Sequence, residues 1–418
     1  MAGAVARMEL RGIPLDLSAV EEHTKPLGEL VSEYEVRLHD FGVEPGSSAS
    51  FLSKMESEGL VEHFREGTKL TTKKEVLQRA EDAETHPACR LFRKHRDFRR
   101  MIYFLTQLKR LQGVDGRIRC KLDQIESASG RMASRRPNLI GLPAVLRPII
   151  ASPDSREQAE LDFCQIEIGV GAAWWGDDNL LALYNRDDAY SAVAQELFAN
   201  ILSKEDCRIS ASEFKVKHAG LRKKTKVILL GLLYGMGAVG LAHRLKCSVE
   251  EAASHLERLF ESFPKARRGA QLGIEHSISR GYATSVSGFK RFLHDYNNRD
   301  RNALRNHPIQ SSAMVIFKKA LLKVDREFRG TDVWVLLPRH DSILIEYPIE
   351  KREAVVERVR ALMIEAVKEV FPEMQPRVEA KFGRSWPTER TLFDELVAIR
   401  KSRIGHQDSD TLKRPKVN

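Results

Sequence analysis

The sequence predicts an α+β fold built from more than one packed unit. Residues 15–40 and 88–112 carry apolar side chains at helical spacing, whereas residues 281–293 and 332–348 have the pattern of β-hairpins. A chain of 418 residues exceeds what a single hydrophobic core usually holds. We therefore expect two or three packed units that share a cleft.

Composition narrows the class of protein. Hydrophobic residues make up 42% of the chain and charged residues 30%, which is typical of a soluble globular protein. The 68 Lys and Arg residues outnumber the 58 Asp and Glu residues and give a net charge of +10. This excess favours a polyanionic partner but does not by itself identify nucleic acid.

Neither disulfides nor a membrane span is expected. The five cysteines are scattered and include no C-x-x-C pair, which indicates neither a disulfide framework nor a zinc site and fits a reducing interior. The longest uncharged stretch, residues 227–242, is shorter than the roughly 20 residues that span a bilayer. The first residues have too short an apolar run for a secretory signal. We expect a soluble, cytoplasmic protein.

In the first half of the chain, the helix predicted at 88–112 has one apolar and one basic face. The basic face either grips a phosphate backbone or is simply solvated, and the sequence leaves both interpretations open. It consists of Arg93, Lys94, Arg96, Arg99, Arg100, Lys109 and Arg110.

In the second half, two aspartates fall at strand ends. The segment 159–173 begins as a strand and turns toward a helix just after Asp162, and the polar break in the hairpin 332–348 places His340 and Asp341 at its tip. Carboxylates on adjacent strand ends can bridge magnesium ions, which prefer hard oxygen ligands. A single aspartate in such a place is more often a turn former, so the pair must be judged with its surroundings.

Residues 213–262 are predicted to be helical with a glycine-rich middle, and they carry a periodic stripe. Arg222, Lys226, Leu230 and Tyr234 recur every four residues, so a helix would align them along one face. Two cations followed by an apolar and an aromatic residue suit a nucleoside triphosphate, with charge for the phosphates and flatter groups for base and sugar. A surface helix with a buried apolar end is the alternative.

A different class of protein is suggested by GMGAVG at 235–240, which matches the glycine fingerprint of dinucleotide-binding folds. Glu257 lies at about the distance expected for a ribose ligand, as in an NAD-dependent oxidoreductase. However, the preceding run opens with a basic cluster and no second strand is evident before Pro264. This reading also leaves the strand-end aspartates unexplained.

Taken together, seven segments in order resemble the family A DNA polymerases of the bacterial DNA polymerase I type. LDFCQIEIGVGAAWWGDDNL (161–180) is similar to motif A, RKKTKVILLGLLYGMGAVGLA (222–242) to motif B and RHDSILIE (339–346) to motif C. The other matches are ARMELRGIPLD (6–16), SGRMASRRPNL (129–139), GYATSVSGFKRF (281–292) and HPIQSSAMVIFK (307–318). The resemblance covers nearly the whole chain and corresponds to the polymerase domain only.

The resemblance implies a right hand of thumb, palm and fingers, in which the palm is an antiparallel sheet flanked by helices. The implied ranges are 1–128 for the thumb and the approach to the palm, 129–190 for the palm with motif A, 191–280 for the fingers with the motif B helix at 222–235, 281–400 for the palm with motif C, and 401–418 for a flexible basic tail.

It also implies template-directed addition of dNTPs to a primer 3′ hydroxyl by two-metal phosphoryl transfer, with two Mg²⁺ ions for which Mn²⁺ can substitute. Asp162, Asp341 and the Phe163 carbonyl would hold the metals, and Lys226 would act as general acid. Further nucleotide-binding residues by motif position are Arg222, Lys226, Leu230, Tyr234, Glu167, Gln165 and Tyr190.

Four residues would contact primer-template DNA. The resemblance implies that Arg131 and Gln310 read the minor-groove side of the primer terminus, and that Asn138 and His340 hold the backbone near it. Glu167 would exclude a 2′ hydroxyl, so deoxyribonucleotides are expected.

Several positions depart from the family pattern. Ser342 replaces the second acid of the H-D-E motif C, as in single-subunit RNA polymerases of phage type, while the retained Glu167 argues against a ribonucleotide polymerase. Leu230 stands where the family has Phe or Tyr, and Tyr190 where it has a triphosphate-binding His. Amides near the template are replaced by Ile140 and Gly141. A ribonucleotide-tolerant or catalytically impaired nucleic-acid-binding relative therefore stays an alternative.

The chain before residue 5 is too short for a proofreading exonuclease or a 5′ nuclease. We therefore expect a monomer that lacks both activities, with a processivity or exonuclease partner supplied in trans, in a bacterial, plasmid or phage context.

Overall fold

The structure, a computed structural model, describes residues 1–186, 188–293 and 300–389, in two compact units. The first unit comprises residues 1–11, 121–140 and 153–384, and the second comprises 12–120, 141–152 and the stretch from Ser385. The tail predicted at 401–418 lies outside the described residues. Among the described residues, no helix is both long and apolar enough to cross a membrane.

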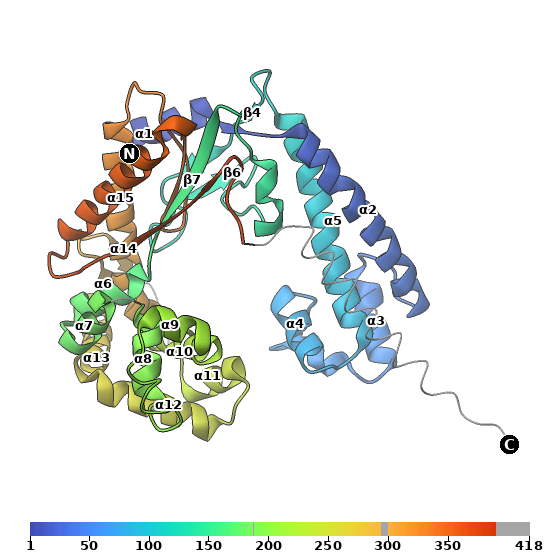
Figure 1. Cartoon of the computed structure of the whole chain (residues 1–418). Coiled ribbons are helices and arrows are strands. Elements are labelled where there is room, and N and C mark those ends of the chain that lie inside the picture. The colour runs from blue at the N-terminus through green and yellow to red at the C-terminus, as the bar shows by residue number, and fades with distance from the viewer. Residues whose placement is uncertain (187, 294–299, 390–418) are drawn as a thin grey trace. The chain divides into compact units, whose positions relative to one another are not determined.

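Two long helices dominate the second unit. Helices α2 (Leu17–Asp40) and α5 (Pro87–Leu111) lie side by side (Figure 1), and they confirm the helices predicted at 15–40 and 88–112. Asp16 caps α2 by accepting a hydrogen bond from the Ala19 amide, and Pro87 starts α5 where its missing N–H costs nothing. Smaller elements are α3 (Ser48–Ser57), α4 (Lys74–Asp82), η1 (Val61–Phe64), η2 (Ala144–Ile149) and the short pairs β1 (Ile13–Pro14) with β4 (Arg117–Ile118) and β2 (Arg65–Glu66) with β3 (Lys69–Leu70).

The basic face of α5 is divided between internal pairing and solvent. Arg93 forms an ion pair with Glu81, and Lys109 forms one with Glu21. The remaining cations include Arg96, which donates to Thr72, and the exposed Arg99, Arg100 and Arg110. Part of this face therefore stabilises the unit, and part stays accessible to an anionic partner.

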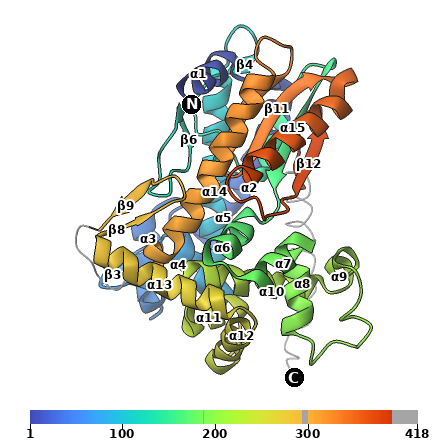
Figure 2. The same cartoon turned by 90° about the vertical axis from the view of Figure 1, so that its left-hand side faces the viewer.

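A four-stranded antiparallel sheet forms the centre of the first unit. Its order is β10-β11-β7-β12, with bounds Trp334–Arg339, Ser342–Pro348, Arg156–Phe163 and Val378–Gly383. Helix α15 (Arg352–Lys368) packs on the sheet, and α14 (Asp300–Glu327) packs on α15 (Figure 2). The expected antiparallel sheet flanked by helices is confirmed. Also in this unit are α1 (Ala2–Arg11), β5 (Lys121–Asp123) and β6 (Ala133–Arg135).

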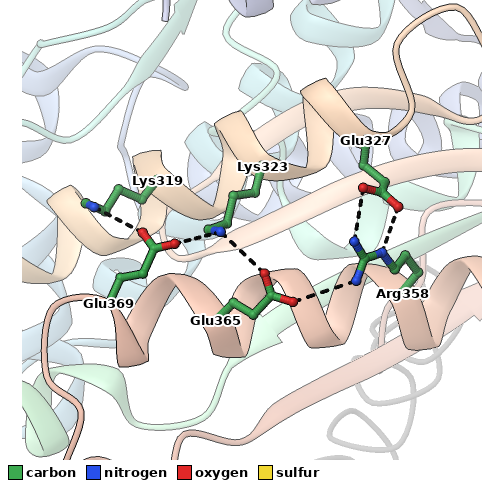
Figure 3. A network of polar contacts seen from close by, with 6 residues as sticks. All are labelled: Lys319, Lys323, Glu327, Arg358, Glu365 and Glu369. Atoms are coloured by element: carbon green, nitrogen blue, oxygen red, sulfur yellow. Dashed lines mark hydrogen bonds and ion pairs between the residues drawn. The ribbon is translucent and has the colours of Figure 1, made fainter.

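An ionic network joins α14 to α15 (Figure 3). Lys323 of α14 binds both Glu365 and Glu369 of α15, and Arg358 of α15 binds Glu327 of α14. Cations and carboxylates alternate along the chain of contacts between the helices, so every charge in the network faces an opposite one. Lys319 extends the row through Glu369.

The rest of the first unit is mostly helical. Helix α6 (Ile166–Trp175) follows β7 directly, and α10 (Ala219–Tyr234) carries the predicted stripe. The remaining elements are α7 (Asp178–Arg186), α8 (Ala189–Leu197), α9 (Ala211–Lys217), α11 (Ala238–Leu245), α12 (Val249–Ser262), α13 (Pro264–Arg280) and the hairpin of β8 (Tyr282–Thr284) with β9 (Lys290–Phe292).

The dinucleotide-binding interpretation of GMGAVG is wrong. The fingerprint requires a strand before its first glycine, but the residues preceding Gly235 form helix α10. Gly235 has a positive φ of 64° and ends that helix as a C-cap. Gly235 and Gly237 therefore separate α10 from α11, and Gly240 lies within α11.

Candidate active site

The sheet brings the two predicted aspartates together. Asp162 on β7 is paired in register with Ser342 on β11, and Asp341 directly precedes Ser342. The Phe163 amide donates to the Asp341 carbonyl at 3.4 Å, which closes the sheet at this end. His340 has a φ of 54° at the hairpin tip, where the backbone must reverse. Two carboxylates thus stand on adjacent strand ends, as the sequence predicted.

These carboxylates repel one another. Desolvation raises the pKa of Asp162, whose side chain keeps a solvent-accessible edge, and the negative charges of Asp341 and Glu160 raise it further. Desolvation also raises the pKa of Asp341. A divalent cation would relieve this repulsion, because it favours the ionised forms of both groups.

The donor set fits magnesium. Across residues 1–186, 188–293 and 300–389, no three His, Cys, Asp or Glu side chains converge as a metal-binding group. Magnesium is commonly held by only one or two carboxylates together with water and substrate phosphates. Asp162 and Asp341 match that mode, whereas a metal caged entirely by protein does not.

A third acid stands beside this pair. Ser342 donates through Oγ to Glu160 Oε1 at 2.7 Å, and Arg339 Nη1 lies 3.4 Å from the same oxygen. Side chains alternate along a strand, so Glu160 and Asp162 share one face of β7. Glu157 points to the other face, where it pairs with Arg352 at the start of α15. The face of β7 that carries the aspartate therefore points away from α15.

Glu167, near the start of α6, connects two residues predicted to bind nucleotide or DNA. Arg131 Nη2 donates to Glu167 Oε1 at 2.9 Å, and the Tyr234 hydroxyl donates to Glu167 Oε2. Gln310 of α14 also bonds to Tyr234. Burial and the nearby Glu167 raise the pKa of Tyr234 to about 12, so its hydroxyl keeps its proton at neutral pH. Motif A and the end of α10 are thereby connected.

The cationic end of the α10 stripe meets a second acid. Arg222 forms two hydrogen bonds to Asp188, at 2.6 and 2.9 Å. The buried ring of Tyr190 lies 5.5 Å from the Arg222 guanidinium and 5.8 Å from Lys226 Nζ, measured to the ring centroid. Gln165 donates to Asp188 and accepts from the Ala189 amide at 3.1 Å. Arg222 and Gln165 thus hold one carboxylate, and Tyr190 lies against Arg222 and Lys226.

The other predicted residues are placed as follows. Leu230 is half-buried on α10, between Lys226 and Tyr234 along the stripe. Phe163 is buried at the end of β7, and the exposed His340 stands at the hairpin tip. Asn138 follows β6 and accepts a hydrogen bond from Ser134 at 3.2 Å. Their roles in binding stay predictions.

Sequence reasoning missed two acids, Asp188 and Glu160. Asp188 caps α8 by accepting from the Ser191 amide, and its position two residues before Tyr190 was a usable signal. Glu160 could have been found from strand alternation, since it lies two residues before Asp162.

The antiparallel sheet with paired strand-end aspartates, next to a helix with a cationic stripe, places the protein among the right-hand polymerases. Comparison with known families specifies the group. The model of DNA polymerase family A matches residues 44–388, and the chain belongs to this family.

Individual relatives agree with this assignment. DNA polymerase I of Mycobacterium bovis is 29% identical over 404 residues, which cover 91% of this chain and 43% of the relative. The thermostable DNA polymerase I of Thermus thermophilus is 27% identical over 419 residues, which cover 92% of this chain and 47% of the relative. The chain thus spans less than half the length of these relatives.

A solved structure is also similar. It is the POL domain of Pol1 from M. smegmatis in complex with DNA primer-template and dNTP. The TM-score is 0.79 at 27% sequence identity, and the match covers 92% of this chain and 69% of that chain.

Proposed function

We propose that this chain is a DNA-directed DNA polymerase that adds dNTPs to the 3′ hydroxyl of a primer on a DNA template. The observation that carries the proposal is the pairing of Asp162 with Asp341 at adjacent strand ends, within a chain that belongs to DNA polymerase family A. The M. smegmatis relative was solved with DNA primer-template and dNTP, which supports these substrates here. The cytoplasmic location, the monomeric state and partners in trans stay predictions.

Asp162 and Asp341, with the Phe163 carbonyl, would hold two Mg²⁺ ions, for which Mn²⁺ can substitute. When bound, such ions lower the pKa of the attacking hydroxyl and stabilise the pyrophosphate that leaves. The chain's own contribution is to hold two carboxylates close together, although burial raises the pKa of each of them. It also places Asp162 near the end of β7 and Asp341 in the turn directly before β11.

The α10 stripe would bind the triphosphate. Arg222 and Lys226 supply positive charge on one helix face, and Lys226 can donate a proton to the leaving group as general acid. Tyr190 lies against both cations and limits the conformations they adopt. Because Asp188 already pairs with Arg222, an arriving triphosphate would compete with that carboxylate for the guanidinium. Leu230 would contact the sugar or base with apolar surface only.

Glu167 would select the sugar. Its carboxylate is held by Arg131 and Tyr234, so it cannot turn aside at low cost to make room for a 2′ hydroxyl. Arg131 and Gln310 would also contact the primer terminus, with Asn138 and His340 near the backbone. Tyr234 would occupy the templating position until the template base enters.

Primer extension tests the proposal. A labelled primer-template is incubated with Mg²⁺ and each dNTP or rNTP in turn, using the unmutated chain, Asp341→Ala and Asp332→Ala. Asp332 is a matched control because it lies near the far end of the same hairpin and pairs with Lys351. Templated dNTP addition is expected for the unmutated chain and the control, and loss of addition for Asp341→Ala with primer-template binding retained.

Other outcomes would favour the alternatives. Preferred addition of rNTPs would indicate that Ser342 is a better guide to the substrate than Glu167. Binding of primer-template without extension by the unmutated chain would identify a catalytically impaired nucleic-acid-binding relative.

A further inference from the structure

Motif C of this chain lacks its second acid, yet the space beside it holds a carboxylate. Ser342, the residue at that position, is buried and donates to Glu160 Oε1 at 2.7 Å. Glu160 comes from β7, whereas the missing acid would have come from β11. The register places Ser342 opposite Asp162 and Glu160 two residues away on the same face.

We propose that Glu160 supplies from β7 the negative charge that the family carries in motif C, and that it acts on the metal-holding aspartates as a positioning residue. The inference rests on the proposed function, since it concerns the same metal site. The acid therefore lies on β7 instead of β11, two residues before Asp162.

The contact between Ser342 and Glu160 explains why only one of the two positions is acidic. Both residues are buried, with exposed fractions of 1% and 8%. A glutamate at position 342 would place a second carboxylate against Glu160, in a region already crowded by Asp162 and Asp341. Buried like charges at hydrogen-bonding distance cannot both stay ionised at low cost. A hydroxyl avoids the repulsion and donates a hydrogen bond instead.

Glu160 also pairs with a cation that acts on both aspartates. Arg339 Nη1 lies 3.4 Å from its Oε1, and Lys381 on β12 is its partner in the strand register. Desolvation raises the pKa of Asp162 and of Asp341, and the positive charge of Arg339 already opposes that rise in both. Without the Glu160 charge beside it, the Arg339 guanidinium would offset the aspartates more fully and weaken the attraction of the site for a divalent cation. The carboxylate thus acts through Arg339 and Ser342, as residues that support metal ligands commonly do.

Direct measurement of Mn²⁺ affinity tests this role separately from catalysis. Mn²⁺ alone is titrated into the full chain, without DNA or nucleotide, and free Mn²⁺ is followed by electron paramagnetic resonance. Glu160→Gln keeps an oxygen that can accept from Ser342 but removes the charge. We expect its Mn²⁺ affinity to fall about 10-fold or more, the size seen for residues that support metal ligands.

The matched control is Glu157→Gln. Glu157 is also a buried carboxylate on β7, but it faces the other side of the sheet and pairs with Arg352. This variant should lower the melting temperature and leave Mn²⁺ affinity unchanged. Equal Mn²⁺ affinity in Glu160→Gln and the unmutated chain would overturn the inference and reduce Glu160 to a buried hydrogen-bond acceptor.

A swap of the two residues tests whether the acid can act from either strand. The double variant Glu160→Ser with Ser342→Glu returns the acid to β11 and should recover most of the Mn²⁺ affinity, whereas Ser342→Glu alone should lower the melting temperature. Failure of the swap to recover affinity would contradict the proposal that Glu160 takes the role of the motif C acid. Asp162→Asn with Asp341→Asn serves as the reference: if Mn²⁺ still binds there, the proposed metal site itself is wrong, independently of Glu160.

Discussion

Acidic residues in two regions of the first unit have opposite electrostatic surroundings, and their pKa values shift in opposite directions. Between α14 and α15, Glu327 and Glu369 face cations, and hydrogen bonds from Arg358 and Lys323 respectively lower their pKa values (Figure 3). At the end of β7, Asp162 faces Asp341, and desolvation with like charge raises its pKa. The network is satisfied by the chain alone. The aspartate pair needs something from outside, and such unrelieved charge is typical of functional sites.

The largest effect is expected where the charges are unrelieved. Asp162→Asn should reduce templated dNTP addition by about 1000-fold or more, since losing a charged metal ligand costs on the order of 4 kcal/mol at the transition state. The same change removes a repulsion, so the melting temperature in EDTA at pH 8 should stay equal or rise. Primer extension and calorimetry measure the two effects. A large drop in melting temperature would contradict the comparison.

Two arginines extend the comparison to ligand binding. Arg222 pairs with Asp188 where a triphosphate is expected, and Arg358 pairs with Glu327 in the network. Arg222→Ala should raise the dNTP KM about 10- to 100-fold, since a hydrogen bond to a charged group contributes roughly 1.5–3 kcal/mol. Arg358→Ala should leave KM unchanged. Steady-state kinetics on a primer-template measures the dNTP KM of each variant. A KM of Arg222→Ala equal to that of the unmutated chain would show that Arg222 does not bind the nucleotide.

The pH dependence of stability should have opposite signs in the two regions. Because folding raises the pKa of Asp162, its contribution to stability is greatest below the unfolded value of about 3.9 and is lost as the pH rises through the folded value. The pKa of Glu369 is lowered, so its contribution is present above about 4.3 and is lost in acid.

Melting temperatures of the unmutated chain, Asp162→Asn and Glu369→Gln, measured in EDTA from pH 4 to 8, test this opposite pH dependence. The gain from Asp162→Asn over the unmutated chain should grow as the pH rises, and the loss from Glu369→Gln should shrink as the pH falls. A gain from Asp162→Asn that is largest at pH 4 would show that the pair is not under repulsion. Adding Mg²⁺ at pH 8 should stabilise the unmutated chain more than Asp162→Asn.

The smallest effect is expected in the network. Lys323→Ala removes the contacts with Glu365 and Glu369, yet surface ion pairs contribute only about 0–1 kcal/mol each. Urea denaturation should show a loss within that range, smaller still at high salt, with dNTP addition unchanged. A loss of activity in Lys323→Ala would show that the two regions are coupled.

The sequence alone determined the elements whose signals are local. Helical spacing gave the long helices α2, α5 and α10, and alternation about a polar break gave the hairpin with Asp341 at its tip. Ordered motifs gave the family, because residue types at fixed positions carry the chemistry. The glycine fingerprint at 235–240 gave a wrong prediction, because a short motif does not specify whether a strand or a helix precedes it.

Tertiary structure decided what depends on register and on contacts between distant segments. Pairing of β7 with β11 brings Asp162 next to Asp341, which are far apart along the chain. It also sets Glu160 against Ser342, so the position that seemed to have lost an acid lies beside one. Register arises from the packing of whole strands, and no single segment encodes it.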